Sequence, residues 1–183
     1  MSTRIRTARV DDIDAMGALI DRFAAEDLML SRSREFLVER LRDFVIAEDE
    51  TGAFLGCCAL AALTPELAEV RSLAVAPEAG RRGVGKALVD ECIAQARRLG
   101  LRRVFALTLV PDFFMRCGFT LTSLGRLPEK SASECPVCPK RGRCDEHAML
   151  LHLDGTSPRA LEPGEPWGYT RIFLGREPDR ENT

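Results

Sequence analysis

Hydrophobic and polar positions along this chain follow either a period of two or spacings of three and four. Period-two alternation and short apolar runs predict strands, whereas apolar positions three and four apart predict helices. Helices are predicted after a cap at Asp11, after a cap at Ser31 or Ser33, and over residues 84–99 and 112–117. The predicted strands cover residues 5–10, 44–47, 53–61, 104–109, 119–124 and 149–153, together with a strand that begins at Glu69.

The order of these elements is β-α-α-β-β-β-α-β-α-β-β. This order predicts an α/β (α+β) fold, with one mixed central sheet and helices on both faces. Residues 1–153 are predicted to form this single domain, with a polar insertion at 125–147 that carries cysteines and prolines. Residues 154–183 are rich in Pro, Gly and charge, so we predict a tail with little structure of its own.

The composition limits the classes of partner. The 183 residues are 45% hydrophobic and 30% charged, which is ordinary for a soluble globular protein. The formal net charge is −2, so no overall field attracts nucleic acid or a membrane surface. No apolar run reaches the roughly 18 residues of a membrane span, and the N-terminus lacks a signal-peptide pattern. The cysteines number seven, which is odd, and favour a reducing, cytoplasmic location over a disulfide scaffold.

A glycine-rich segment, Gly80-Arg-Arg-Gly-Val-Gly-Lys86, lies between a predicted strand and a predicted helix. Gly83 and Gly85 have no Cβ where backbone N–H groups must approach a ligand, and the helix N-terminus adds a partial positive charge. Together these features predict a cradle for a pyrophosphate. A P-loop is excluded because Lys86 is followed by Ala87, and the glycine spacing does not fit a Rossmann loop.

Two segments together resemble the GNAT superfamily of N-acetyltransferases. Residues 80–85 resemble its acetyl-CoA loop, Gln/Arg-x-x-Gly-x-Gly/Ala, with Gly80 in place of the usual Gln or Arg. Residues 114–119 resemble its Tyr-x-x-x-Gly-Phe segment, but Phe114 stands at the tyrosine position. The phenol that many members use as a general acid is therefore absent from this position.

Within that superfamily, the chain resembles the N-acetylglutamate synthases over residues 3–153. Residues 28–37 look like the Arg-Ser-x-x-x-Leu loop of that group. The segments Leu127-Pro-Glu-Lys130, Cys135-x-x-Cys138 and Cys144-Asp-Glu146 look like its single-domain bacterial branch. The chain has no counterpart of the amino-acid-kinase-like domain that the longer synthases carry.

The resemblance implies the GNAT fold and acetyl-CoA as the cosubstrate. It also implies that two strands diverge after Glu69, so that an acyl group enters the sheet between them. Backbone groups at Leu73, Ala74 and Val75 would hold the pantetheine arm and the thioester, next to Phe114. The residues implied for the rest of the cofactor are Arg81, Arg82, Gly83, Val84, Gly85 and Lys86.

Acetyl transfer to an amine needs a base, because an α-ammonium has no lone pair until it loses a proton. Glu69 is the predicted base, with a pKa raised by partial burial, and it acts directly or through a water. The alternative is a solvent-facing glutamate at a strand end. Thr108 is the predicted group that stabilises the leaving thiolate, and its alternative is an ordinary β-branched strand residue.

The predicted acceptor is L-glutamate, because arginine forks match carboxylates. Leu30 and Arg32 lie in the loop that overhangs the acceptor pocket in the family. Arg71 shares a strand face with Glu69, and it either binds substrate or holds Glu69 in an ion pair. Lys130 is a further substrate-binding candidate.

The cysteine-bearing insertion permits two interpretations. Cys135, Cys138, Cys144 and His147 have the residue types and close spacing of a structural zinc site. The interpretation that we adopt assigns no metal, because only one Cys-x-x-Cys pair is present. Reduced cysteines would then pack the insertion against the acceptor pocket.

The sequence therefore predicts an acetyl-CoA-dependent acetyltransferase acting on the α-amine of L-glutamate, the first step of arginine biosynthesis. One alternative keeps the fold and donor but takes another small amine or a protein N-terminus. A second alternative, from a different class, is a non-catalytic acyl-CoA-binding regulatory module. The partner is a small-molecule substrate, with no nucleic acid and no membrane, and a homodimer is left open.

Overall fold

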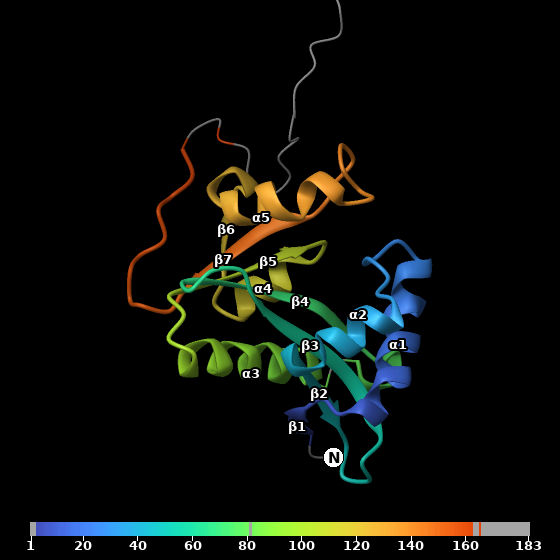
Figure 1. Ribbon diagram of the computed structural model, residues 1–183. Coiled ribbons are helices and arrows are strands. Elements are labelled where there is room, and N and C mark those ends of the chain that lie inside the picture. Colours follow the sequence, from blue (N-terminus) through green and yellow to red (C-terminus); the bar gives the residue numbers. More distant parts are fainter. Residues whose placement is uncertain (1–2, 81, 163–164, 166–183) are drawn as a thin grey trace, which may run out of the picture.

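A seven-stranded sheet organises the described part of the chain, which is residues 3–80, 82–162 and 165 of a computed structural model (Figure 1). The strand order is β1-β2-β3-β4-β5-β7-β6; β4 and β5 pair in parallel, and the other neighbours pair antiparallel. The mixed sheet predicted from the sequence is thus confirmed. The strands are β1 (Arg4–Thr7), β2 (Phe44–Glu48), β3 (Phe54–Ala62), β4 (Leu67–Val75), β5 (Arg103–Thr108), β6 (Thr120–Thr122) and β7 (His147–His152).

Helices cover both faces of this sheet, as predicted (Figure 1). On one face lie α1 (Ile13–Ala25) and α2 (Arg34–Glu39), and on the other lie α3 (Val84–Arg98) and α4 (Pro111–Arg116). Strand β2 is buried along its length, because alternate residues pack against opposite layers. Phe44 and Ile46 pack in the cluster of α1, while Val45 and Ala47 pack in the cluster of α3.

The insertion folds over the same face of the sheet as α1. It contains α5 (Pro128–Ser133), flanked by 3-10 turns at Leu124–Arg126 and Cys135–Val137. Leu124 and Leu127 pack with Leu67 of β4 and Phe105 of β5 in a separate buried cluster. The insertion therefore has an apolar anchor of its own, and it faces α2 across the sheet surface.

Strand β4 carries a bulge in the middle of its length. Cys57 of β3 pairs with Ala74 but Ala59 pairs with Arg71, so Cys58 alone faces two residues of β4. Ser72 has a left-handed backbone with φ of 52°, which is uncommon outside glycine. The extra residue reverses the alternation, so Leu73 and Val75 pack against the α3 cluster together with Ala68 and Val70.

Strands β4 and β5 separate next to this bulge. They pair through three positions, which end at Glu69 opposite Phe105. From there β4 continues along β3, and β5 continues along β7. Among the described residues, the divergence that the family resemblance implied is therefore present, and it begins at Glu69.

Several local predictions need correction. The α1 helix starts after a 3-10 turn at Val10–Asp12, and Asp12 rather than Asp11 receives the backbone N–H of Arg9, at 2.6 Å. Asp12 is held there by the guanidinium of Arg6 on the preceding strand β1, at 2.7 Å, a contact that local capping rules do not include. Ser33, one of the two proposed caps, does accept the Phe36 N–H at 3.2 Å.

The segment after Asp154 lies only partly within the described residues. The Arg126 guanidinium donates to the carbonyls of Arg159 and Ala160, at 2.8 and 3.0 Å, and pairs with the Glu165 carboxylate. Residues 163–164 and 166–183, most of the predicted tail, lie outside them. Across the described part of the chain, no helix has the length and apolar character that crossing a membrane requires.

Candidate active site

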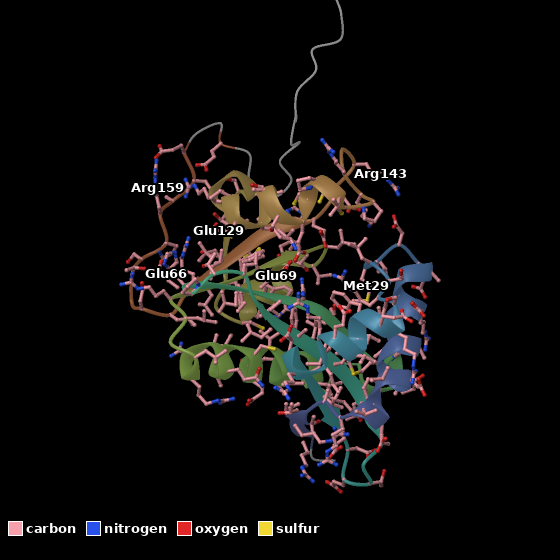
Figure 2. All side chains as sticks on the ribbon, in the orientation of Figure 1. Met29, Glu66, Glu69, Glu129, Arg143 and Arg159 are labelled. Atoms are coloured by element: carbon pink, nitrogen blue, oxygen red, sulfur yellow. The ribbon has the colours of Figure 1, made fainter. Side chains whose placement is uncertain are left out.

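A cavity of about 570 Å³ opens on the sheet face between α2 and the insertion. Its floor is formed by β4 and β5 where they diverge, and its walls come from the loop after α1 and from the insertion. Figure 2 shows Glu69 near the centre of the molecule and Met29 on the wall beside α1. Eight residues predicted from the sequence line this cavity: Leu30, Arg32, Glu69, Arg71, Leu73, Thr108, Phe114 and Lys130.

Glu69 is buried on the cavity floor and is held by two cations. The Lys130 ammonium donates to its Oε2 at 2.8 Å, and an Arg71 nitrogen lies 3.7 Å from the same oxygen. Burial raises the pKa of Glu69 above its ordinary value, although the charge of Lys130 opposes the shift. A glutamate with a raised pKa suits proton acceptance near neutrality better than an exposed one. The solvent-facing alternative for Glu69 is therefore wrong.

A second glutamate, Glu134, completes this cluster and was not predicted. It follows α5 directly, and its carboxylate accepts from Lys130 at 2.6 Å and from Arg71 at 3.0 Å. Partial burial opposes its charge, but Lys130 and Arg71 lower the pKa of Glu134 overall. Two carboxylates and two cations thus alternate, and the cluster is close to neutral. Two sequence signals could have revealed it: Pro128 at a helix start and the i,i+4 spacing of Lys130 and Glu134.

Arg32 differs from the other two predicted cations, because it has no carboxylate partner within the described part of the chain. Its guanidinium carbon lies 4.8 Å from the Phe36 ring centroid, and its Nε lies 3.5 Å from the Ser72 hydroxyl. No carboxylate of the described residues lies within 4.0 Å of it. Burial, and then the nearby charge of Arg71, lower the pKa of Arg32, but a guanidinium keeps its charge. A half-buried, unpaired cation in a cavity is a binding position for an anion.

Thr108 lies at the end of β5, buried where that strand has separated from β4. Its Oγ1 accepts the Val110 backbone N–H at 3.0 Å. That contact fixes the side chain and leaves the hydroxyl hydrogen for donation into the cavity. Phe114 is buried beside it in edge-to-face contact with Phe113 and Phe119, so this position contributes shape and no proton.

The predicted pyrophosphate loop lies at the N-terminus of α3, outside the lining of this cavity. Gly83 caps the helix with φ of 77°, and a Cβ there would meet no atom within 4 Å. A Cβ on Gly85 would meet the Phe113 ring at 3.4 Å. The Lys86 ammonium is paired with Asp90 at 2.6 Å. Val84 and Ala74 are buried in the core, so only their backbone can face a ligand, and Arg81 lies outside the described residues.

Two further charged residues of the insertion were missed. The Lys140 ammonium is buried and donates to the Asp27 carbonyl at 2.9 Å, with the Asp27 carboxylate at 3.2 Å. This contact joins the insertion to the loop after α1, the two walls of the cavity. Glu146 lines the cavity with no cation of the described residues within 4.0 Å, and burial raises the pKa of its carboxyl.

The cysteines of the insertion contribute to the lining of the cavity. Cys135, Cys138 and Cys144 all face it, whereas His147 lies in β7 opposite Thr108. In the described ranges, no three His, Cys, Asp or Glu side chains gather in a way that could hold a metal ion. Burial raises the pKa of the Cys135 thiol to about 11. The placement agrees with cysteines packing the insertion against the pocket.

Comparison with proteins of known sequence identifies relatives of this chain. An uncharacterized N-acetyltransferase of Chlorobaculum tepidum is 42% identical over 151 residues, which are 82% of this chain and 97% of that protein. The amino-acid acetyltransferase of Mycobacterium tuberculosis is 40% identical over 63% of this chain and 67% of its own length. The amino-acid acetyltransferases of Neisseria meningitidis are longer, and the chain spans only 29% of their length, at 37% identity.

Solved structures of acetyltransferases are also similar to this chain. The N-acetylglutamate synthase of Neisseria gonorrhoeae, complexed with coenzyme A and N-acetyl-glutamate, superposes with a TM-score of 0.75 at 31% identity. The match covers 84% of this chain and 35% of that one. A Mycobacterium tuberculosis protein in complex with CoA has a TM-score of 0.72 at 32% identity, over 82% and 99% of the two chains.

A sequence profile covers most of the domain. It describes the acetyltransferase (GNAT) family and matches residues 14–119, from α1 through the divergent strands and the glycine loop to the end of α4. With the sheet order, the split at Glu69 and the glycine-capped α3 helix, this match establishes that the chain belongs to the acetyltransferase (GNAT) family.

Proposed function

We propose that this chain is an N-acetyltransferase that transfers the acetyl group of acetyl-CoA to the α-amine of L-glutamate. The observation that carries the choice of acceptor is Arg32, a half-buried guanidinium in the same cavity as Glu69 that has no carboxylate partner among the described residues. A cationic acceptor such as a polyamine would be repelled there, whereas an acceptor carboxylate would pair with it. The complex of the gonococcal synthase with N-acetyl-glutamate supports the same choice.

The donor side of the proposal rests on backbone geometry. Acetyl-CoA would lay its pyrophosphate on the N–H groups that begin α3, where Gly83 and Gly85 leave room. Its thioester would reach the gap between β4 and β5, beside Leu73 and Thr108. The complexes of two relatives with coenzyme A support this assignment. The Lys86 ammonium is a weaker candidate for cofactor binding than the sequence predicted, because Asp90 already pairs with it.

The proposed reaction is direct attack on the thioester. Glu69 accepts a proton from the α-ammonium, directly or through a water, and the amine nitrogen forms a bond to the carbonyl carbon. The C–S bond breaks with its electron pair on sulfur, and the Thr108 hydroxyl donates a hydrogen bond to that sulfur. The second proton of the attacking nitrogen passes through solvent to the thiolate, which leaves as CoASH. When Glu69 becomes neutral, Lys130 keeps a second carboxylate position, which Glu134 fills in this structure, so this buried cation stays compensated. The products are N-acetyl-L-glutamate and CoA.

The proposed reaction corresponds to the entry step of arginine biosynthesis, and we place it in the cytoplasm. Seven free cysteines, all within the described residues, support a reducing location.

An acceptor screen tests the function. The purified chain and acetyl-CoA are incubated with glutamate, glutamine, aspartate or spermidine, and released thiol is measured. We expect the highest kcat/KM with glutamate. If glutamine or spermidine is the better acceptor, the chain is an acetyltransferase of another substrate, and if no amine releases thiol, the non-catalytic binding module replaces the enzyme.

The donor loop gives a separate prediction. Gly83→Val places a β-branched residue at a positive φ and is expected to weaken acetyl-CoA binding at least tenfold by calorimetry, because the N–H groups of the loop move. Gly52→Val is the matched control, since Gly52 has φ of 85° and equally open surroundings at the tip of the β2–β3 hairpin. Equal affinities in both folded variants would exclude residues 80–86 as the pyrophosphate site.

A further inference from the structure

Glu134 occupies the hydrogen-bond donors of two cavity cations that the sequence assigned to the substrate. Its two oxygens accept separately, Oε1 from Arg71 at 3.0 Å and Oε2 from Lys130 at 2.6 Å. An acceptor carboxylate that takes these same N–H donors of Arg71 and Lys130 would displace the Glu134 carboxylate. Substrate and side chain would compete for the same two donors with the same functional group.

The exposure of its side chain to solvent distinguishes Glu134 from the other charged residues around Glu69, and allows its carboxylate to move away from the two cations. Its side chain is 43% exposed, whereas the side chains of Arg71 and Lys130 are 10% and 9% exposed. Glu69, at 5%, has no comparable access to solvent. Glu134 follows the last residue of α5, so its carboxylate reaches water by rotation about side-chain bonds. The two cations remain fixed in the cavity wall.

Arg32 provides a second anion position close to the first. The guanidinium carbons of Arg32 and Arg71 lie 4.8 and 5.5 Å from the centroid of the same Phe36 ring. Arg32 has no carboxylate partner in the described ranges, and Arg71 holds the partly exposed Glu134. The spacing around a single ring suits an acceptor that carries two carboxylates a few bonds apart.

We propose that Glu134 is a specificity-determining residue, whose carboxylate stands in the position of one acceptor carboxylate and is exchanged for it when a dicarboxylic amino acid binds. This inference rests on the proposed function. Exchange of one carboxylate for another keeps Arg71 and Lys130 paired, while Arg32 takes the second acceptor carboxylate. The neutral amide of an acceptor such as glutamine cannot replace the charge of Glu134. If the amide displaced Glu134, Arg71 and Lys130 would lose a compensating charge. Glu134 thus excludes monocarboxylic acceptors by competition and weakens the binding of the accepted ones.

The test removes the competing charge. Glu134→Gln is expected to lower KM for glutamate roughly tenfold, with KM for acetyl-CoA unchanged. The dissociation constant of glutarate, a dicarboxylate without an amine, should fall by a similar factor in calorimetry. Glu129→Gln is the matched control, because Glu129 lies on the same helix and pairs with Arg103 at 3.2 Å, away from the cavity. The control should leave all three constants unchanged.

A purely structural role for Glu134 predicts the opposite result. If Glu134 only fixes α5 to β4, Glu134→Gln loosens the wall, and both KM for glutamate and the glutarate constant rise. Unchanged constants would equally overturn the proposal. If Glu134→Gln does not fold, Glu134→Asp is the second variant. Its carboxylate keeps the charge but reaches Arg71 and Lys130 less well, so it competes less with the acceptor. KM for glutamate and the dissociation constant of glutarate should therefore fall in this variant too.

The same measurements separate this inference from the proposed function. If the wild-type chain acetylates glutamate but Glu134→Gln lowers neither KM for glutamate nor the dissociation constant of glutarate, only the carboxylate exchange is rejected. A wild-type chain that does not acetylate glutamate rejects the function, whatever Glu134→Gln does to glutarate binding.

Discussion

Replacing Glu69 with glutamine is expected to lower kcat about 10²–10⁴-fold, the range that a positioned general base contributes. Glutamine keeps the shape of the side chain and removes its basicity. Glu134 still compensates Lys130, so we expect the variant to fold and to bind acetyl-CoA as before. Steady-state kinetics with glutamate and calorimetry with acetyl-CoA measure the two effects separately. A variant with wild-type turnover would reassign Glu69 to a structural role.

The pH profile gives a second signature of the same group. A base acts only when deprotonated, and burial raises the pKa of Glu69 above that of an ordinary glutamate. Activity of the wild-type chain should therefore fall as pH decreases through that raised pKa, and this acidic limb should disappear in Glu69→Gln. Glu66→Gln is the control, because Glu66 precedes β4 on the surface, paired with Arg102 at 3.3 Å.

The second large effect concerns the acceptor. We expect a preference for glutamate over glutamine of at least ~10²-fold in kcat/KM, because glutamine leaves a buried cation without its partner. Arg32→Ala should remove most of this preference by raising KM for glutamate, while acetyl-CoA affinity stays unchanged. Arg34→Ala is the matched control, since Arg34 is exposed and pairs with Asp14. A preference that survives Arg32→Ala would move the recognition of the acceptor carboxylate to other residues.

Local sequence patterns were sufficient for most strands and for the α3 helix with its glycine turn. The spacing of Val84, Leu88, Cys92 and Ala96 predicted the buried face of α3, and Gly83 predicted the turn that begins it. Leu99, predicted on the same face, instead follows the last residue of α3 and is exposed. These features depend on residues within one or two helical turns of each other. The base at Glu69 and the guanidinium at Arg32 depended on a family resemblance, and their roles remain predictions.

The bulge at Ser72 shows what alternation alone misses. An uninterrupted strand would place Leu73 on the face of Glu69 and Arg71. The inserted residue instead turns Leu73 toward the α3 cluster, where it packs next to the gap between β4 and β5. Nothing in the residue types around Ser72 marks the position of the extra residue.

The cavity wall formed by the insertion was the least predictable part of the site, for a different reason. Lys130 and Glu69 are 61 positions apart in sequence, and Glu134 and Arg71 are 63 apart. Such contacts depend on how the insertion folds over the sheet, and its helix is too short for periodicity to identify. Lys130 was predicted from a motif, whereas Glu134 was identified from its contacts with Lys130 and Arg71.

The link between Lys140 and Asp27 has a consequence for how acceptor specificity can change. Lys140 lies 113 positions from Asp27, yet it holds together the two segments that carry Arg32 and Glu134. Exchanging either segment alone with that of a relative would break this buried contact, whereas exchanging both together would preserve it. The donor loop at the start of α3 takes no part in the link. Acceptor choice in this scaffold should therefore evolve, or be engineered, as a matched pair of loops transplanted onto an unchanged acetyl-donor half.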